Sequence, residues 1–306
     1  MPILAEISAR RKTENIIKLV DRYLKVTEEK KSWPKVQKEY LYIVTDYMPY
    51  TICDLNISPN YYLSQDKATQ NEIKLSQARN QCLEAIKQVM RGVFFGLRDL
   101  HALGITHRDI KLSNILISNN RYPINKVKIC DLGSSKKLVS NPADESTQSL
   151  NYIGTRAFRA PELIVGNRYY DTKIDIWSAG IIFLKLIVVG YLSKKCSLFN
   201  VMNSKALAKV VTELVGDPNR AELEEMLATN DLLSGSIKAG LSEEEIVGKR
   251  FKKLDSMINC KIPATMLDLL HKMLELSPTR RISAVEALRH PFFSEESEMT
   301  KRSKEY

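Results

Sequence analysis

The stretch from His107 to Asn114 reads His-Arg-Asp-Ile-Lys-Leu-Ser-Asn and decides the fold. Two shorter motifs follow it along the chain, Asp131-Leu132-Gly133 and Ala160-Pro161-Glu162. Alone, each motif is short enough to be a solvated turn or the start of a helix. Together and in this order, they indicate one site assembled from residues that lie far apart in the chain.

The residue types in these motifs suit transfer of a phosphoryl group, which needs a positioned metal, a positioned nucleophile and neutralised charge. By their places in the motif, Asp109 fits a carboxylate beside the acceptor hydroxyl and Lys111 fits a cation near the γ-phosphate. Mg²⁺ prefers oxygen ligands, and Asn114 and Asp131 offer an amide oxygen and a carboxylate. We therefore predict catalytic roles for Asp109 and Lys111, and a nucleotide and metal site at Asn114 and Asp131.

The composition is that of a globular chain with a basic surface. Of its 306 residues, 44% are hydrophobic and 27% are charged, which allows one large or two modest domains. Lys and Arg outnumber Asp and Glu by 46 to 36, so the net charge is +10, and a basic surface can attract nucleic acid, lipid or acidic protein. The sequence has no zinc-ligand spacing and no RNA- or DNA-binding motif, so we expect no nucleic-acid partner.

The five cysteines are widely spaced and form no Cys-x-x-Cys motif, which is typical of reduced thiols inside a cell. The first residues lack the charged and apolar regions of a signal peptide. The most apolar stretch, Ile181–Val189, contains Lys185 and is too short to cross a bilayer. We therefore expect a soluble protein of the cytoplasm, the nucleus or both, with no membrane partner.

The pattern of apolar residues predicts an α+β fold. Residues 1–20 are expected to form one helix that leads into a short strand, and the β-branched and aromatic residues 40–47 a strand that Pro49 ends. A long amphipathic helix is predicted over residues 80–103, and Gly104 is expected to end it.

The second half of the chain is predicted to hold short strands, a long loop and then helices only. The strands are expected over residues 114–117 and 127–130, and the functional loop over residues 131–162. The predicted helices lie near residues 171–189, 203–215, 219–229, 263–275 and 283–289.

Two further segments extend the motifs into a family resemblance. Residues 152–162 resemble the segment that ends in Ala-Pro-Glu in the group of cyclin-dependent kinases, mitogen-activated protein kinases and glycogen synthase kinases. Residues 175–180 (Asp-Ile-Trp-Ser-Ala-Gly) resemble the start of the central helix of that fold. From about residue 40 to residue 293 the chain is thus similar to eukaryotic protein kinases. The resemblance implies a protein-kinase-like fold with a complete, mostly α-helical C-lobe, ATP and Mg²⁺ as cofactors, and a protein substrate.

The same resemblance implies roles for single residues. Asp175 would hold the catalytic loop, and Arg281 would pair with Glu162. Lys111 and the substrate-loop residues Thr155 and Arg159 fit a serine/threonine kinase rather than a tyrosine kinase.

Two more positions are assigned by the resemblance to regulation and to nucleotide binding. Tyr152 lies where glycogen synthase kinases carry a regulatory tyrosine, and packing is its alternative role. Backbone groups of Asp46 and Met48 would form the hinge that binds adenine, behind a small gatekeeper, Thr45.

The chain departs from the family pattern at its N-terminal end. Since no glycine precedes Gly92, the Gly-x-Gly-x-x-Gly loop that covers the ATP phosphates has no counterpart, and neither does the strand lysine that follows it. Glu6 resembles the helix glutamate that pairs with that lysine. We therefore expect a truncated N-lobe over residues 1–48, a kinase C-lobe over 49–293, and a polar C-terminal tail over 294–306.

Hypotheses from different classes remain open. The first is an active serine/threonine kinase similar to the small single-subunit kinases of fungi that activate cyclin-dependent kinases, which would imply such a kinase as substrate and a role in the cell cycle. We expect it to be a monomer, because no cyclin-binding helix motif lies near Glu6. The second is a pseudokinase that acts as a scaffold or regulatory binding protein, which the missing loop motivates. A third is a gene model that lacks its first exon.

Overall fold

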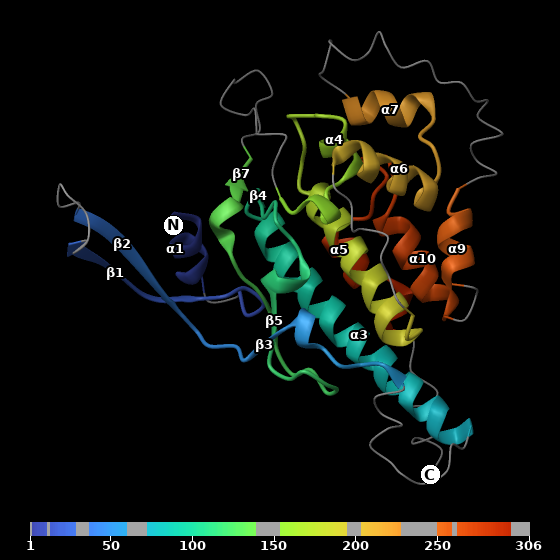
Figure 1. The fold of residues 1–306 in the computed structure, drawn as a ribbon, viewed down its shortest axis with the longest axis horizontal. Coiled ribbons are helices and arrows are strands. Elements are labelled where there is room, and N and C mark those ends of the chain that lie inside the picture. Colours follow the sequence, from blue (N-terminus) through green and yellow to red (C-terminus); the bar gives the residue numbers. More distant parts are fainter. Residues whose placement is uncertain are drawn as a thin grey trace.

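The computed structural model describes residues 2–10, 13–28, 37–59, 72–138, 154–194, 203–227, 250–258 and 262–294. Figure 1 shows a body of helices at the right and a two-stranded hairpin that projects at the left. Tyr152 and residues 295–306 of the expected C-terminal tail lie outside the described residues. The boundary expected at residue 48 falls in the connection that follows the hairpin.

The N-terminal part consists of helix α1 (Pro2–Ser8) and the hairpin of β1 (Leu19–Glu28) and β2 (Gln37–Thr45). The prediction of one helix over residues 1–20 is wrong beyond Ser8. The β-branched side chains of Ile16 and Ile17 are buried, and β-branched residues favour extended backbone. The N–H of Ile17 donates to the carbonyl of Ile129, at 2.8 Å, in strand β6 (Val127–Ile129).

The predicted long helix is confirmed as α3 (Glu72–His101), which runs through the centre of the body (Figure 1). Buried side chains recur along it at spacings of three and four residues, as in Ile86, Met90, Val93 and Leu97. The helix ends before Gly104, whose φ of 67° lies in the left-handed region that glycine adopts without strain.

The remaining strands are short. Strands β3 (Tyr50–Thr51), β5 (Ile115–Ile117) and β6 form one antiparallel sheet in the order β3-β5-β6. Strand β4 (Ile105–Thr106) pairs with β7 (Lys136–Lys137). The predicted strands at 114–117 and 127–130 are confirmed to within one residue.

Helices make up the C-terminal part, close to their predicted positions. The described helices are α4 (Pro161–Ile164), α5 (Lys173–Lys185), α6 (Ser204–Val215), α7 (Arg220–Leu227), α9 (Lys252–Ile258), α10 (Ala264–Met273), α11 (Ala284–Leu288) and α12 (Pro291–Ser294). Helix α5 continues into a π-helical turn over Leu186–Tyr191. The α+β fold with a helical C-terminal body is thus confirmed.

Helix α5 is the central element of that body. Its side chains are buried nearly all round, Trp177 and Phe183 among them. By length and composition, the segment Lys173–Tyr191 is apolar enough to cross a membrane, but most of it is buried inside the protein. Core helices pass the same test, so the finding is weak support for a membrane span.

Candidate active site

Helix α5 fixes the loop that carries Asp109. The carboxylate of Asp175, in the first turn of α5, accepts hydrogen bonds from the backbone N–H groups of His107, at 2.8 Å, and Arg108, at 2.9 Å. His101 Nε2 lies 2.9 Å from the same carboxylate. Arg108 has a φ of 69°, which is uncommon for a residue other than glycine. The buried carboxylate of Asp175 therefore holds the loop in a conformation that it would not adopt alone, the role that the resemblance implied.

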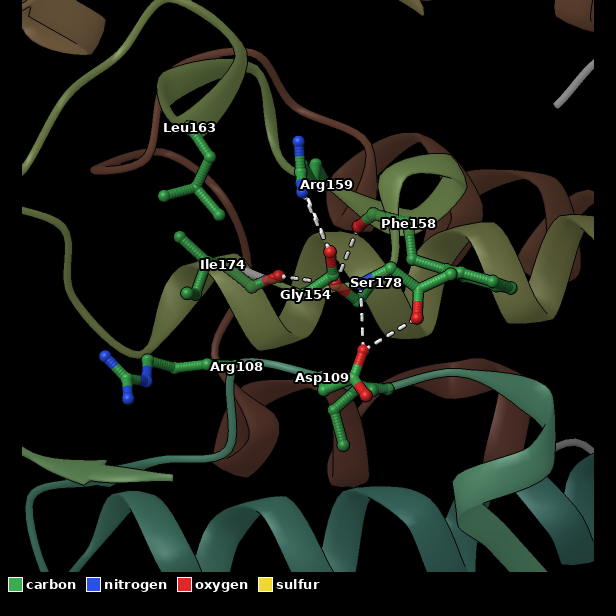
Figure 2. Close-up of a pocket in the computed structure, with 10 residues that line it drawn as sticks. Arg108, Asp109, Gly154, Phe158, Arg159, Leu163, Ile174 and Ser178 are labelled. Carbon is green, nitrogen blue, oxygen red and sulfur yellow. Dashed lines mark hydrogen bonds between the residues drawn. The ribbon is translucent and has the colours of Figure 1, made fainter. Parts of the chain in front are cut away.

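Asp109 is the centre of a dense set of polar contacts (Figure 2). Its Oδ1 atom accepts hydrogen bonds from both the backbone N–H and the hydroxyl of Thr155, each at 2.8 Å. Its Oδ2 atom accepts a hydrogen bond from Lys111 Nζ at 2.6 Å. The structure thus brings together three of the predicted residues, Asp109, Lys111 and Thr155, around one carboxylate.

These contacts set the charge of Asp109. Partial burial of the carboxylate raises its pKa, but the hydrogen bonds from Lys111 and Thr155 outweigh that effect and hold the pKa of Asp109 below its usual value. The group is therefore an ionised hydrogen-bond acceptor at neutral pH. Such a group can orient an acceptor hydroxyl and receive its proton.

Asn114 and Asp131 are brought together by the short sheet. The backbone N–H of Cys130, the residue before Asp131, donates to the carbonyl of Asn114 at 2.9 Å. Asn114 is buried, and its Nδ2 group donates to the backbone carbonyl of Asp109 at 2.8 Å. The side chain of Asn114 is thus oriented with its nitrogen toward Asp109, while Asp131 is exposed at the end of β6.

The residue types of Asn114 and Asp131 suit a Mg²⁺ ion. They supply a carboxylate and an amide oxygen, which are hard ligands, and Mg²⁺ in proteins is bound by one or two carboxylates together with water and substrate phosphates. The described part of the chain contains no group of three His, Cys, Asp or Glu residues that could hold a metal alone. A site at Asn114 and Asp131 therefore suits a cation that arrives with a nucleotide.

A small pocket lies between the Asp109 loop and the segment that follows Gly154. It is lined by Arg108, Asp109, Ile110, Gly154, Thr155, Phe158, Arg159, Leu163, Ile174 and Ser178. Figure 2 shows the guanidinium of Arg159 directed at the carbonyl of Gly154, to which Nη2 donates at 3.0 Å. Ser178 Oγ donates to the carbonyl of Phe158 at 2.7 Å, which ties the same segment to α5. Arg159 thus holds the wall of the pocket that contains Thr155.

The segment is anchored further along by a buried ion pair. The guanidinium of Arg281 donates to both carboxylate oxygens of Glu162, at 2.7 and 2.9 Å, and both side chains are almost fully buried. Arg281 also donates to the backbone carbonyls of Lys173 and Glu275. The pairing that the resemblance implied for Glu162 and Arg281 is confirmed.

The predicted hinge residues Asp46 and Met48 lie just after β2, in a segment without regular secondary structure. The side chain of Asp46 has partners that the sequence did not reveal. It accepts a hydrogen bond from the N–H of Lys18 at 2.8 Å and pairs with Lys128 Nζ at 2.5 Å. Burial raises the pKa of Asp46, but the hydrogen bonds from Lys128 and Lys18 outweigh it, so the pKa is lowered. The sequence could not predict the Asp46–Lys128 pair, because the two residues lie far apart in the chain and no local sequence pattern connects them.

Glu6 lies on α1 and pairs with side chains outside the hairpin. Its carboxylate lies 3.3 Å from Arg10 Nη2 and 3.5 Å from Lys137 Nζ in β7. Among the described residues, Glu6 therefore pairs with a residue just beyond the end of α1 and with a residue just beyond the Asp131 motif. Both pairs are partly exposed, so each contributes little to stability.

Comparison with known proteins agrees with this geometry. The protein kinase domain family matches residues 2–293. Protein kinase gsk31 of Schizosaccharomyces pombe is 31% identical over 86% of this chain and 58% of its own length. Glycogen synthase kinase 3 of Trypanosoma brucei brucei is 29% identical over 85% of this chain and 63% of its own.

A third relative, mitogen-activated protein kinase hog1 of Blastobotrys adeninivorans, is 31% identical over 80% of this chain and 55% of its own length. The chain thus spans less than two thirds of each of these relatives. The match covers the loop of Asp109, the Asp131 edge and the anchored segment after Gly154. The chain is similar to glycogen synthase kinases and mitogen-activated protein kinases, and it belongs to the protein kinase domain family.

Proposed function

We propose that this chain is a serine/threonine protein kinase that transfers the γ-phosphoryl group of ATP to a protein hydroxyl. The observation that carries the proposal is the Asp109 carboxylate, which accepts a hydroxyl hydrogen from Thr155 and an ammonium hydrogen from Lys111 at the same time. A carboxylate that receives a hydroxyl proton beside a cation is what phosphoryl transfer to an alcohol requires. A protein that only binds partners would not need these groups in contact.

Each residue then has a defined task. Asp109 orients the acceptor hydroxyl and takes its proton, and Lys111, which contacts that carboxylate, offsets the charge that develops on the transferred group. Asn114 and Asp131 would hold Mg²⁺, which when bound offsets the charge of the phosphates. The Gly154–Arg159 segment would position the protein substrate, because it forms the wall of the pocket beside Asp109.

The nucleotide would be bound by the hinge and the C-lobe, with a truncated N-lobe above it. The sequence contains no glycine before Gly92, so a glycine-rich loop has no counterpart within residues 1–91. The described hairpin contacts the body through α1 and through Lys18, Asp46 and their partners. Adenine would therefore rest on backbone groups of residues 46–48.

For the substrate we propose the activation-loop threonine of a cyclin-dependent kinase. The proposal rests on the resemblance to small single-subunit activating kinases, which share the reduced glycine loop and a polar segment between the hinge and the long helix. Transfer of label from ATP to an inactive cyclin-dependent kinase, but not to the same protein with its activation-loop threonine replaced by alanine, is the expected result. Equal labelling of both proteins would contradict it.

A second candidate function is favoured by the contacts of Glu6. The strand lysine expected to pair with this glutamate has no counterpart, and Glu6 contacts Arg10 and Lys137 instead. A pseudokinase that acts as a scaffold would need no such lysine. The two functions are separated by Mg·ATP binding, measured by calorimetry, and by transfer of labelled phosphate to a generic protein acceptor. A kinase shows both activities, whereas a scaffold shows no binding at millimolar ATP and no transfer.

A further inference from the structure

The Asp46 carboxylate lies at the junction of the hairpin, the hinge and the C-lobe. Its Oδ1 atom accepts a hydrogen bond from the N–H of Lys18, the residue just before β1, at 2.8 Å. Its Oδ2 atom lies 2.5 Å from Lys128 Nζ, and the side chain of Lys128 is only 12% exposed. The N–H of Asp46 in turn donates to the carbonyl of Lys18, at 3.3 Å. The Asp46 side chain thus joins the first hinge residue both to Lys18, the residue before β1, and to Lys128 in β6.

Lys128 lies in strand β6, which leads to Asp131, one of the two predicted magnesium ligands. The residues on either side of it, Val127 and Ile129, have backbone groups that bond to Asn15 and Ile17. Strand β6 is therefore held from the N-terminal side by several hydrogen bonds. Asp131 follows Lys128 by three residues, and the intervening Cys130 is bonded to Asn114. A continuous series of short contacts and chain bonds therefore runs from Asp46 through Lys128 and Cys130 to both predicted magnesium ligands.

The hairpin gives the hinge little support from side-chain packing. Tyr23 and Tyr42 stack on one face of it, and Leu24 and Leu41 pair on the opposite face. All of these side chains are at least 40% exposed, and so are most of their apolar neighbours in the two strands. Burial therefore contributes little to the position of residues 46–48. The hydrogen bond and the ion pair of Asp46 are therefore the main local contacts that fix the position of the hinge backbone.

We propose that Asp46 and Lys128 are positioning residues, whose ion pair holds the hinge backbone at a fixed distance from Asp131 so that one nucleotide reaches both. The inference rests on the proposed kinase function and adds to it a role for two side chains outside the catalytic motifs. Adenine and the phosphates are covalently joined in one ligand, so the two ends of its site must keep a separation that this ligand can span. The Asp46–Lys128 pair is a direct side-chain link between the hinge and the strand that leads to Asp131.

The test uses the full chain with two variants that preserve shape. Asp46→Asn keeps an acceptor for the N–H of Lys18 and removes the charge, whereas Lys128→Met keeps the apolar stem of the lysine and removes its ammonium group. Since loss of binding that is equal in the ground and transition states raises KM alone, each variant should raise the KM for ATP. We expect a rise of about tenfold, as for loss of a partly buried charged hydrogen bond, with kcat and the KM for the protein acceptor within about twofold of wild type.

Further variants separate positioning from stability. The double variant should be no worse than either single variant, because both remove the same interaction. Lys128→Arg retains a cation, so its KM for ATP should stay close to the wild-type value, unlike that of Lys128→Met. Glu224→Gln removes an exposed ion pair with Arg220 on α7 and serves as the matched control, with no change expected.

Four results would overturn the proposal. If the variants lower the melting temperature while the KM for ATP stays at its wild-type value, the pair is merely structural. If the double variant shows the sum of two independent effects, the residues do not act as a pair. A wild-type protein without Mg·ATP binding would overturn the kinase function and this inference together, whereas an active wild type with unaltered variants overturns this inference alone.

Discussion

Asp109 receives hydrogen bonds from Lys111 and Thr155, which come from separate parts of the chain. The short spacing from Asp109 to Lys111 follows from the loop itself, because Asp175 holds the loop's backbone. The contact with Thr155 requires that the later segment fold back onto the loop, which Arg159 and Ser178 secure. The ionisation of Asp109 thus depends both on the conformation of its own loop and on the folding of the Gly154–Arg159 segment onto that loop.

The pH dependence of activity follows from the lowered pKa of Asp109. The pKa lies below its ordinary value of 3.8, so the carboxylate stays ionised until the pH falls through that lower value. Its contribution to stability is likewise present above the unfolded pKa and lost only in acid. We expect a profile of kcat/KM with no acidic limb from Asp109 between about pH 5 and pH 8. An acidic limb in that range that moves to higher pH in Asp109→Glu would contradict this expectation.

Gly154→Ala tests the geometry of the substrate segment. Gly154 has a φ of 71°, and a Cβ atom there would lie 2.5 Å from the carbonyl oxygen of Arg108. The left-handed conformation alone costs about 1–2 kcal/mol for a residue other than glycine, and the clash moves Thr155 away from Asp109. We expect a lower melting temperature and a lower kcat/KM for the protein acceptor. A variant with wild-type values for both would show that the segment adopts another conformation.

At this scale, the sequence could predict residues whose roles follow from local spacing. Asp109, Lys111 and Asn114 lie within one loop, and Asp131 follows a short strand, so a motif could place them. The pairs Asp46–Lys128 and His101–Asp175 could not be predicted from residue patterns, because each forms between distant segments. Such pairs depend on tertiary packing, which periodicity does not encode.

Among the elements, helix α5 and the segment before it depend on one buried ion pair. Arg281 and Glu162 have side chains that are 0% and 2% exposed. Removal of one partner leaves the other charge buried without compensation. The connection matters for the site because Glu162 follows the substrate segment directly.

Arg281→Met should therefore destabilise the protein by about 3–5 kcal/mol. The measurement is the free energy of unfolding from a urea titration. Arg220→Met, which removes an exposed ion pair with Glu224, is the matched control and should cost about 0–1 kcal/mol. Equal losses in the two variants would contradict the role assigned to the buried pair.

Elements with strong periodicity were predictable and the hairpin was only partly so. The spacing of apolar residues correctly predicted helix α3. The helix begins at Glu72, eight residues before the predicted start at residue 80. A short strand was predicted at the end of residues 1–20, but the extent of β1 to Glu28 was missed because its residues carry no clean alternation of apolar and polar types. The helix predicted over the same residues was extended into the Ile16–Ile17 segment. Backbone bonding to β6 fixed that segment as extended chain.

At the scale of the whole molecule, stability is unevenly distributed. The β1–β2 hairpin projects from the helical body (Figure 1). The body buries large side chains completely, whereas the hairpin exposes apolar groups on both faces. A two-stranded hairpin is at best marginally stable alone. We infer that the body sets the free energy of unfolding and that the hairpin contributes little to it.

The same substitution at two sites tests this distribution. Leu97 in α3 is fully buried, and Leu24 in β1 is 68% exposed. We expect Leu97→Ala to cost about 2–5 kcal/mol and Leu24→Ala less than about 0.5 kcal/mol, both measured by denaturant unfolding. A large cost at Leu24 would mean that the hairpin is covered in solution.

The central claim is that Asp109 performs phosphoryl transfer. The most direct measurement is the initial rate of label transfer from Mg·ATP to a protein acceptor by the wild-type chain and by Asp109→Asn, at saturating ATP. The amide keeps the size of the carboxylate but cannot take a proton, so we expect a loss of about 10²–10⁴-fold in kcat with nucleotide binding retained. An Asp109→Asn protein that transfers phosphate as fast as the wild type would contradict the account.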